Sequence, residues 1–344
     1  MVKFIVRRVI EAIPLLFIVS IILFVLINAV GDPLAVFGEA RNKPNAQQRE
    51  EIRRRLGLDQ PIYMQYLTWL IGNDWQMVDV RGDGTLMEAG TRKGVLRGEF
   101  GNSIITRTPA IRRIQERLPN TLLLMVPAFI ITVILAILIG IFSAIYQYSL
   151  FDNLVTGLSF FFYSMPIFFI ALMCIYIFGV QFDRWGLDGL PIGGMGEPGA
   201  PKTFANVFPY MIMPTFCLVA IQLAGYVRFV RSSMLEVMTQ DYIRTARSKG
   251  MFESRVVRLH AVKNAALPLV TLIGLDIPLL LAGAVVTERI FAWPGMGRLF
   301  TESLERSDFN VMMLILMLLS VAVIVFQIIT DIVYTWFDPR IRFN

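Results

Sequence analysis

Residues 241–268, DYIRTARSKGMFESRVVRLHAVKNAALP, form a cationic stretch between two long apolar segments. Gly250 can adopt the positive-φ turn that ends a helix without steric cost, and Glu253 or Ser254 can begin the next helix. The stretch therefore predicts two short helices joined at Gly250.

The second of these helices is expected to have an apolar face. Phe252, Val256 and Leu259 follow one another at spacings of four and three, which places them on one side of a helix. Such a helix can dock on a partner. The alternative is a plain loop between two spans, since inner loops are cationic by default, but a plain loop requires neither the periodicity nor the glycine.

The composition is that of an integral membrane protein. Of 344 residues, 56% are hydrophobic and only 17% are charged, and the mean hydropathy is +0.62; soluble domains are far less apolar. The net charge of +6 comes from basic residues beside apolar segments, not from a stripe typical of nucleic-acid binding. Cys174 and Cys217 fall inside apolar segments, and we expect no disulfide.

Six apolar segments are long enough to cross a bilayer. The first, Ala12 to Val30, follows a basic N-terminus and is interpreted as an uncleaved signal anchor; cleavage near Gly31 is the alternative. Five others lie at roughly 121–146, 154–180, 208–230, 269–287 and 311–336. The sequence thus predicts an all-α polytopic membrane protein with six spans. Prolines lie within these segments at positions 14, 127, 166, 214 and 278, where they are expected to kink helices.

The segments divide the chain into three parts. Residues 1–30 hold the N-terminal tail and first span, 31–118 a water-exposed lobe, and 119–344 a five-span core that includes the cationic helices at 232–268. In the lobe, AQQREEIRRRLG and LDQPIYMQYLTWLIG predict short helices. The stretch RGDGTLMEAGTRKGVLRGEFG, rich in glycine and charge, leaves a loop and a β-hairpin both open.

The orientation follows from basic residues in the short loops. With the N-terminus inside, the inner loops and termini hold thirteen lysines and arginines and the outer short loops hold five. Basic residues concentrate on the cytoplasmic side, whereas a long translocated lobe largely escapes this rule. We therefore expect both termini and the cationic stretch to be cytoplasmic.

No catalytic constellation is visible. The chain lacks a G-x-x-x-x-G-K-[ST] phosphate loop, and its only histidine, His260, leaves no H-E-x-x-H metal site. We interpret His260 as a packing or surface residue. Asp276 is the one acid deep in an apolar segment, with Pro278 two residues later and Gln222 as a milder polar candidate for a pathway. Asp276 is either functional or a structural hydrogen-bonding group.

Several motifs in order carry a family resemblance. DYIRTARSKG followed by RLHAVKNAALPLVT resembles the cytoplasmic coupling motif of ABC importer permeases of the oligopeptide/dipeptide type. Further matches are RRVIEAIPLLFIVSIILF, RRRLGLDQPIYMQYLTWL, GEFGNSI, RLPNTLLL, GAVVTERIFAWPGMGRL and DIVYTWFDPRIR. They span the whole chain and are similar to the first of the two permease subunits, the B-type transmembrane subunit.

The resemblance implies a six-span type I ABC importer transmembrane domain with an extracytoplasmic lobe between spans 1 and 2. It implies a homologous second permease in a heterodimer, two cytoplasmic ATPase subunits and an extracytoplasmic solute-binding protein. The chain itself would bind no cofactor or metal, with ATP and Mg in the partner subunits. The implied substrates are oligopeptides or dipeptides; nickel chelates, glutathione and opine-like solutes are alternatives.

Carried over residue by residue, the resemblance places Arg244, Thr245 and Ala246 where the wider family has Glu-Ala-Ala. Gly250 becomes the motif glycine, and the part from Phe252 onward would insert into the ATPase. The implied ATPase-coupling residues are Asp241, Arg244, Thr245, Ala246, Lys249, Gly250, Phe252, Val256, Leu259, His260 and Pro268. Two departures are a long 72–97 segment and a 147–153 link without basic residues.

Two further function classes stay open on the residues alone. A secondary carrier or channel could use Asp276 as its ion or proton site, and it would transport without partners. A membrane enzyme would need catalytic groups that the sequence does not bring together. The expected function is therefore half of a translocation pathway that is driven by separate ATPases, and not an enzyme.

Overall fold

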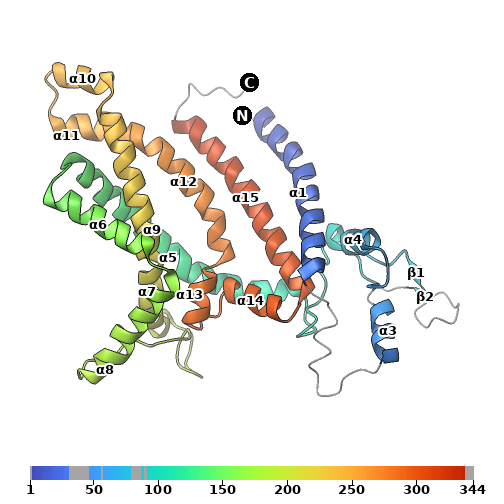
Figure 1. Cartoon of the computed structure of the whole chain (residues 1–344). Helices are drawn as coiled ribbons and strands as arrows, with labels where there is room; N and C mark the ends of the chain where they lie inside the picture. The colour runs from blue at the N-terminus through green and yellow to red at the C-terminus, as the bar shows by residue number, and fades with distance from the viewer. Residues whose placement is uncertain (1, 31–45, 56, 79–86, 89–90, 338–344) are drawn as a thin grey trace. The chain divides into compact units, whose positions relative to one another are not determined.

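Figure 1 shows the computed structural model, which describes residues 2–30, 46–55, 57–78, 87–88 and 91–337. Within these residues six helices are long and apolar enough to cross a membrane: Val6–Ala29, Ala110–Ile145, Ile167–Arg184, Phe204–Met238, Pro268–Ile290 and Phe309–Val333. Their number confirms the six predicted spans. The chain is an all-α polytopic membrane protein.

Four spans belong to uninterrupted α-helices: α1 (Val2–Val30), α5 (Ala110–Ile145), α9 (Phe204–Met238) and α15 (Phe309–Phe337). Three of these extend well beyond the apolar segments that predicted them, and α1 begins at Val2 instead of Ala12. Helix α5 begins inside the 31–118 region, and α9 continues past residue 230 to Met238. Charged residues at these ends do not stop a helix, because helical hydrogen bonding continues outside the hydrocarbon core.

The third predicted span, 154–180, was wrong as a single helix. The structure divides it into α6 (Leu150–Ser164) and α7 (Ile167–Cys174), which continues through the π-helical stretch η2 (Ile175–Gln181) into α8 (Phe182–Arg184). Proline disfavours helical geometry in the residue before it, and Met165 is accordingly extended at φ −82° and ψ 131°. Pro166 therefore separates the two helices.

The fifth predicted span, 269–287, is also divided. Helix α12 (Lys263–Ala282) ends at Gly283, and α13 (Val285–Ile290) follows and leads into α14 (Met296–Glu305). Gly283 has φ 77°, which favours glycine. A Cβ atom there would also lie 2.6 Å from a carboxylate oxygen of Glu288, so the turn needs glycine for space as well.

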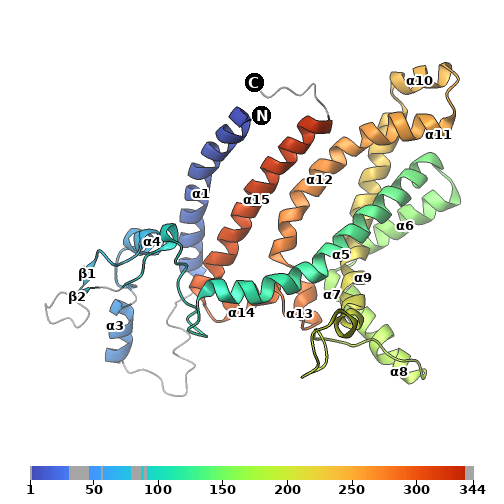
Figure 2. The same ribbon diagram turned by 180° about the vertical axis from the view of Figure 1, so that it is seen from behind.

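The chain forms two compact units. The first, Leu118–Arg298 with Ala322–Asn344, is organised around α9, which contacts α6, α7, α12 and α13. Both views show α10 and α11 at one end of α9 and α13 toward its other end (Figure 1 and Figure 2). Cys174 on α7 and Cys217 on α9 are buried free thiols with Sγ atoms 3.7 Å apart.

The second unit, Val2–Arg117 with Leu299–Val321, combines lobe residues with membrane helices. The lobe contains α3 (Ala46–Arg55), α4 (Ile62–Ile71) and the 3₁₀ turn η1 (Val95–Arg97). Tyr66 and Trp69 of α4 are buried against Phe24 of α1 and Met313 of α15. The expected boundary at residue 31 therefore does not separate the apolar packing of the lobe from that of α1.

Two short strands pair next to the glycine-rich part of the lobe. Strand β1 (Met77–Val78) pairs antiparallel with β2 (Met87–Glu88), Met77 opposite Glu88 and Val78 opposite Met87. Of the described elements, only β2 and η1 fall within the stretch 81–101 for which the sequence left a loop and a β-hairpin open, and β1 precedes that stretch. Residues 79–86 and 89–90 of the long 72–97 segment lie outside the described residues.

Candidate functional site

The predicted helix, glycine and helix are all present in the cationic element, by which we mean residues 241–262. Helix α10 (Asp241–Ser248) is followed by Gly250 at φ 74° and then by α11 (Glu253–Val256). Gly250 donates its backbone N–H to the carbonyl of Arg247 at 2.9 Å. The two helices are also joined by the side chains of Arg247 and Glu253, with N–O distances of 2.6 and 3.1 Å.

The cationic element has one face on the protein and one face open. Ile243 is fully buried and Ala246 is 6% exposed, so α10 packs into the core that also holds α9. Asp241, Arg244 and Lys249 are exposed. Of the predicted coupling residues on α10, Ala246 is therefore buried, whereas the charged side chains face outward.

The expected shared face of Phe252, Val256 and Leu259 was wrong. Val256 is 1% exposed and lies in the core, whereas Phe252 is 82% exposed and Leu259 53% exposed. Phe252 precedes α11 in an extended conformation, and α11 passes at once into the π-helical stretch η3 (Val257–Val262). Spacings of three and four select one face only in a regular α-helix, so the pattern fails here. Phe252 is a large apolar side chain left open to a partner.

The remaining residues of the predicted coupling set lie around these helices. Thr245 is exposed and donates its hydroxyl to the carbonyl of Asp241 at 2.9 Å. His260 is half-buried in η3, and its carbonyl accepts from the side-chain amide of Asn264 at 2.7 Å. Pro268 is an exposed residue inside α12. None of the three is packed as tightly as Val256.

The predicted pathway residues lie near the contact of α9 and α12. The hydroxyl of Tyr226 donates to Asp276 at 2.5 Å, and both side chains come from the membrane-spanning part of their helices. Gln222 lies one turn before Tyr226, and its buried side-chain oxygen has no hydrogen-bond partner among the described residues. Pro278 is buried two residues after Asp276. The structure thus brings these residues to one helix pair.

A buried ion pair was missed by the sequence analysis. Asp152 of α6 is 2% exposed and accepts from the guanidinium of Arg231 on α9 at 2.6 and 2.8 Å. It also accepts from the Ser143 hydroxyl and, at 2.9 Å, from the Tyr148 backbone N–H. The Arg231 hydrogen bonds, helped by Ser143, lower the pKa of Asp152 despite its burial. Partners 79 residues apart give no local sequence signal.

A second buried carboxylate fixes what we call the clamp segment, residues 284–298. Glu288 is fully buried and accepts from the Thr121 hydroxyl at 2.9 Å and from the backbone N–H of Arg298 at 3.0 Å. The same Thr121 oxygen accepts the Met296 N–H at 2.6 Å. A Cβ atom on Gly295 would lie 2.5 Å from the carboxylate, so this glycine makes room for Glu288.

Asn120, next to Thr121 on α5, adds to this attachment. The side chain of Asn120 donates to the carbonyl of Pro294 at 2.8 Å, and the indole of Trp293 donates to the Asn120 carbonyl at 2.9 Å. Trp293 is fully buried. The motifs RLPNTLLL and GAVVTERIFAWPGMGRL, separate in the sequence, therefore meet in one hydrogen-bonded structure.

The cationic element, the divided spans and the clamp segment can now be compared with known proteins. The family described as "Binding-protein-dependent transport system inner membrane component" matches residues 136–343. Its N-terminal counterpart, "Binding-prot-dependent transport system membrane comp, N-term", matches residues 1–125. The chain belongs to this family. It is accordingly a multi-pass inner membrane component of a transport system, not an enzyme.

Relatives of this transport family align over nearly their whole length. The oligopeptide transport system permease protein AppB of Bacillus subtilis is 37% identical over 100% of both chains. The dipeptide transport system permease protein DppB of Escherichia coli is 34% identical over 99% of both. The glutathione transport system permease protein GsiC of Escherichia coli is 32% identical over 100% of both.

The described residues hold no group of three or more histidine, cysteine, aspartate or glutamate side chains that could bind a metal ion. The candidate site is defined by the exposed charges of the cationic element and by the polar contact between Tyr226 of α9 and Asp276 of α12.

Proposed function

We propose that this chain is one of two homologous permease subunits of an ATP-driven importer and that it forms half of the pathway for oligopeptides or dipeptides. Two cytoplasmic ATPase subunits and an extracytoplasmic solute-binding protein would complete the complex. ATP and Mg would act in the ATPase subunits, and this chain would bind no cofactor. The full-length similarity to AppB and DppB supports the peptide substrate class.

The observation that carries the proposal is the two-sided cationic element. Ile243 anchors α10 in the core, while Arg244, Lys249 and Phe252 remain exposed on the other side. A partner that bound these exposed side chains could push α10 without unfolding it. The tight turn at Gly250 joins α10 to α11, and the Arg247–Glu253 pair adds a weaker link between them.

A movement of the cationic element can be transmitted into the membrane because the helical path from α11 to α12 is uninterrupted. Helix α11 passes through η3 into α12 without a loop, and α12 carries Asp276 at its contact with Tyr226 of α9. Packed helices shift as rigid bodies between discrete arrangements. We therefore propose that ATPase closure moves α12 against α9 and opens or closes the pathway beside Gln222 and Asp276.

This mechanism requires the cationic element and both termini to be cytoplasmic. The distribution of basic residues supports that orientation, thirteen in the inner loops and termini against five in the outer short loops. Thiol labelling of a cysteine introduced at the exposed Lys249 should occur only in broken cells. Labelling in intact cells would contradict the orientation and the mechanism together.

Gly250→Val is the sharpest test of coupling. At φ 74° a β-branched residue is strained, so the turn between α10 and α11 should change shape. Gly186 provides a matched control, because it has the same φ of 74° and, like Gly250, open space around its Cβ position. We expect Gly250→Val in the whole complex to lower peptide uptake at least about tenfold while ATP hydrolysis continues. Gly186→Val should transport normally, and equal uptake by both variants would refute the coupling role.

The substrate class can be tested separately. The name of GsiC supports glutathione as an alternative to peptides, and nickel chelates remain a further alternative from the sequence. The decisive measurement is equilibrium binding of each solute to the solute-binding protein that copurifies with the complex. Retention of glutathione or a nickel chelate in preference to short peptides would replace the peptide assignment and leave the coupling mechanism standing.

A further inference from the structure

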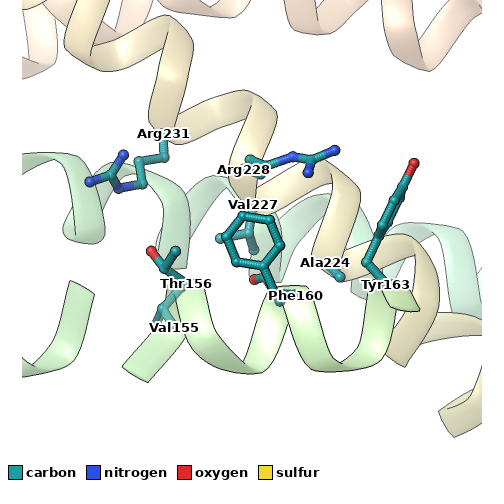
Figure 3. Close-up of a pocket in the computed structure, with 9 residues that line it drawn as sticks. Val155, Thr156, Phe160, Tyr163, Ala224, Val227, Arg228 and Arg231 are labelled. Atoms are coloured by element: carbon teal, nitrogen blue, oxygen red, sulfur yellow. The ribbon is translucent and has the colours of Figure 1, made fainter. Parts of the chain in front are cut away.

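A small cavity lies between α6 and α9, apart from the contact of α9 with α12. Its volume is about 160 Å³, and Figure 3 shows Phe160 and Tyr163 of α6 opposite Arg228 and Arg231 of α9. The hydroxyl-bearing residues Thr156 and Ser159 also line it.

The two arginines of this cavity differ in their partners. Arg231 forms the two-pronged ion pair with Asp152, so its charge is compensated. Arg228 has no carboxylate partner among the described residues. Its guanidinium carbon lies 4.9 Å from the ring centre of Tyr163 and 6.0 Å from that of Phe160. The cavity therefore holds one uncompensated positive charge beside two aromatic rings.

These groups favour a singly charged oxyanion. A guanidinium binds phosphate oxygens through parallel N–H donors, and hydroxyls such as those of Thr156 and Ser159 can add further donors. The volume of about 160 Å³ is below the roughly 300 Å³ at which pockets begin to hold whole drug-sized ligands. A headgroup-sized fragment fits the cavity better than a peptide does.

The position of Arg228 along its helix matches the level of lipid headgroups. Helix α9 has 35 residues, which corresponds to about 52 Å at 1.5 Å per residue, whereas the hydrocarbon core is about 30 Å thick. Arg228 lies in the last third of α9, close to the end of the apolar segment 208–230. Beside the cavity, Leu154 and Leu158 of α6 are each 57% exposed, an apolar surface suited to acyl chains.

We propose that this cavity binds the phosphodiester of an anionic membrane phospholipid, with Arg228 contacting the phosphate and acyl chains lying along α6. Basic pockets between spanning helices are suited to anionic headgroups in general. The bound lipid would hold α6 against α9 beyond the Asp152–Arg231 pair. This inference rests on the membrane location of the chain and not on its transported substrate.

The test measures phospholipid binding to the complex purified in detergent, with full-length chains. Dioleoyl phosphatidylglycerol is titrated, and bound lipid is counted by native mass spectrometry. Arg228→Gln should weaken binding about tenfold, the effect of one lost charge-assisted contact. Ser159→Leu should also weaken binding, because it fills the cavity but keeps every charge.

Two controls separate this site from general attraction and from misfolding. Arg255→Gln removes an exposed arginine of the cationic element that does not line the cavity and should leave lipid binding unchanged. Arg228→Lys keeps the charge and should retain most of the binding. Equal losses in Arg228→Gln and Arg255→Gln would overturn the proposal, as would a wild-type complex that retains no lipid.

Competition identifies the source of the oxyanion. A tripeptide with a free carboxylate, its amide and inorganic phosphate are each added to the lipid-loaded complex. None should displace the lipid. Displacement by the free tripeptide alone would assign the cavity to the transported solute, and displacement by phosphate would assign it to a soluble anion. Either result would overturn the lipid assignment.

Discussion

The core of the first unit and the cationic element hold their acidic side chains in opposite ways. Glu288 and Asp152 are fully or almost fully buried and accept several hydrogen bonds each. Glu253 is 54% exposed and is paired only with Arg247, which is 41% exposed. Buried polar groups stabilise a single arrangement because leaving them unpaired is costly, whereas an exposed pair can open to water. The buried carboxylates therefore hold the core in one arrangement, whereas the exposed Arg247–Glu253 pair of the cationic element can open and form other contacts.

Glu288→Ala should destabilise the core more than any other substitution considered below. Removing the carboxylate leaves the Arg298 N–H and the Thr121 hydroxyl without their acceptor and creates a cavity, at a cost of about 2–4 kcal/mol. The melting temperature should fall by about 4–8 °C. Thermal unfolding in detergent can be followed by a thiol reagent that reacts with Cys174 and Cys217 once they are exposed. Glu197→Ala, at an exposed loop residue, is the control and should melt like the wild type.

Asp152→Asn should have the next largest effect. The substitution keeps the shape of the side chain but leaves the charge of Arg231 uncompensated. Because the Arg231 side chain is 24% exposed and reaches water in part, we expect a loss of about 2 kcal/mol, below that of a fully buried pair. The same thermal unfolding measurement should show this loss as a lower melting temperature. An unchanged melting temperature would mean that the Asp152–Arg231 pair makes no net contribution to the free energy of unfolding.

The same residue predicts a pH dependence. The pKa of Asp152 is lowered in the folded state, so the unfolded chain takes up a proton first as the pH falls. The stabilisation is complete above the ordinary aspartate pKa of 3.8 and is lost as the pH drops below it toward the lower folded pKa. Melting temperatures between pH 7 and pH 3 should therefore decline less in Asp152→Asn than in the wild type.

Tyr226→Phe tests a polar contact of intermediate burial. It removes the hydroxyl that donates to the half-buried Asp276, at an expected cost of about 1 kcal/mol. Asp276→Asn keeps an acceptor oxygen for Tyr226. If Asp276 has only this structural role, peptide uptake by Asp276→Asn should match the wild type. A loss of uptake with normal stability would assign Asp276 to the pathway.

Glu253→Gln should have the smallest effect on stability. Exposed ion pairs contribute at most about 1 kcal/mol and are weakened by salt. We expect a change in unfolding free energy below about 0.5 kcal/mol, with the difference from wild type vanishing at high salt. A large loss would show that the Arg247–Glu253 pair holds α10 and α11 together as firmly as the core carboxylates hold the core.

Local signals explain which parts of the candidate site were predictable. Gly250 was identified because a positive φ after a helix selects glycine, and the structure has φ 74° there. Phe252, Val256 and Leu259 were misplaced because Phe252 precedes α11 and η3 changes the helical period before Leu259, and nothing in their spacing reveals either feature. The sequence therefore predicted the turn at Gly250 but not which side chains of the cationic element are buried and which are exposed.

Long-range pairing explains what the sequence left out. Thr121 donates a hydrogen bond to Glu288 across a separation of 167 residues, and Arg231 donates to Asp152 across a separation of 79 residues. Neither pair has a local pattern, because each partner is an ordinary residue in its own segment. The breaks at Pro166 and Gly283 were visible as residues, but hydropathy averages across a break and predicts one span where the chain makes two helices.

The sequence by itself determined the membrane class, the six spans and the helix, glycine and helix of the cationic element. Apolar length, charge and backbone preference act over a few residues and need no knowledge of neighbours. Only the tertiary structure decided that Glu288 and Asp152 are buried, that Phe252 is open and that Tyr226 bonds to Asp276. Those properties depend on which segments meet in space, because burial and hydrogen bonding belong to pairs of surfaces and not to single stretches of chain.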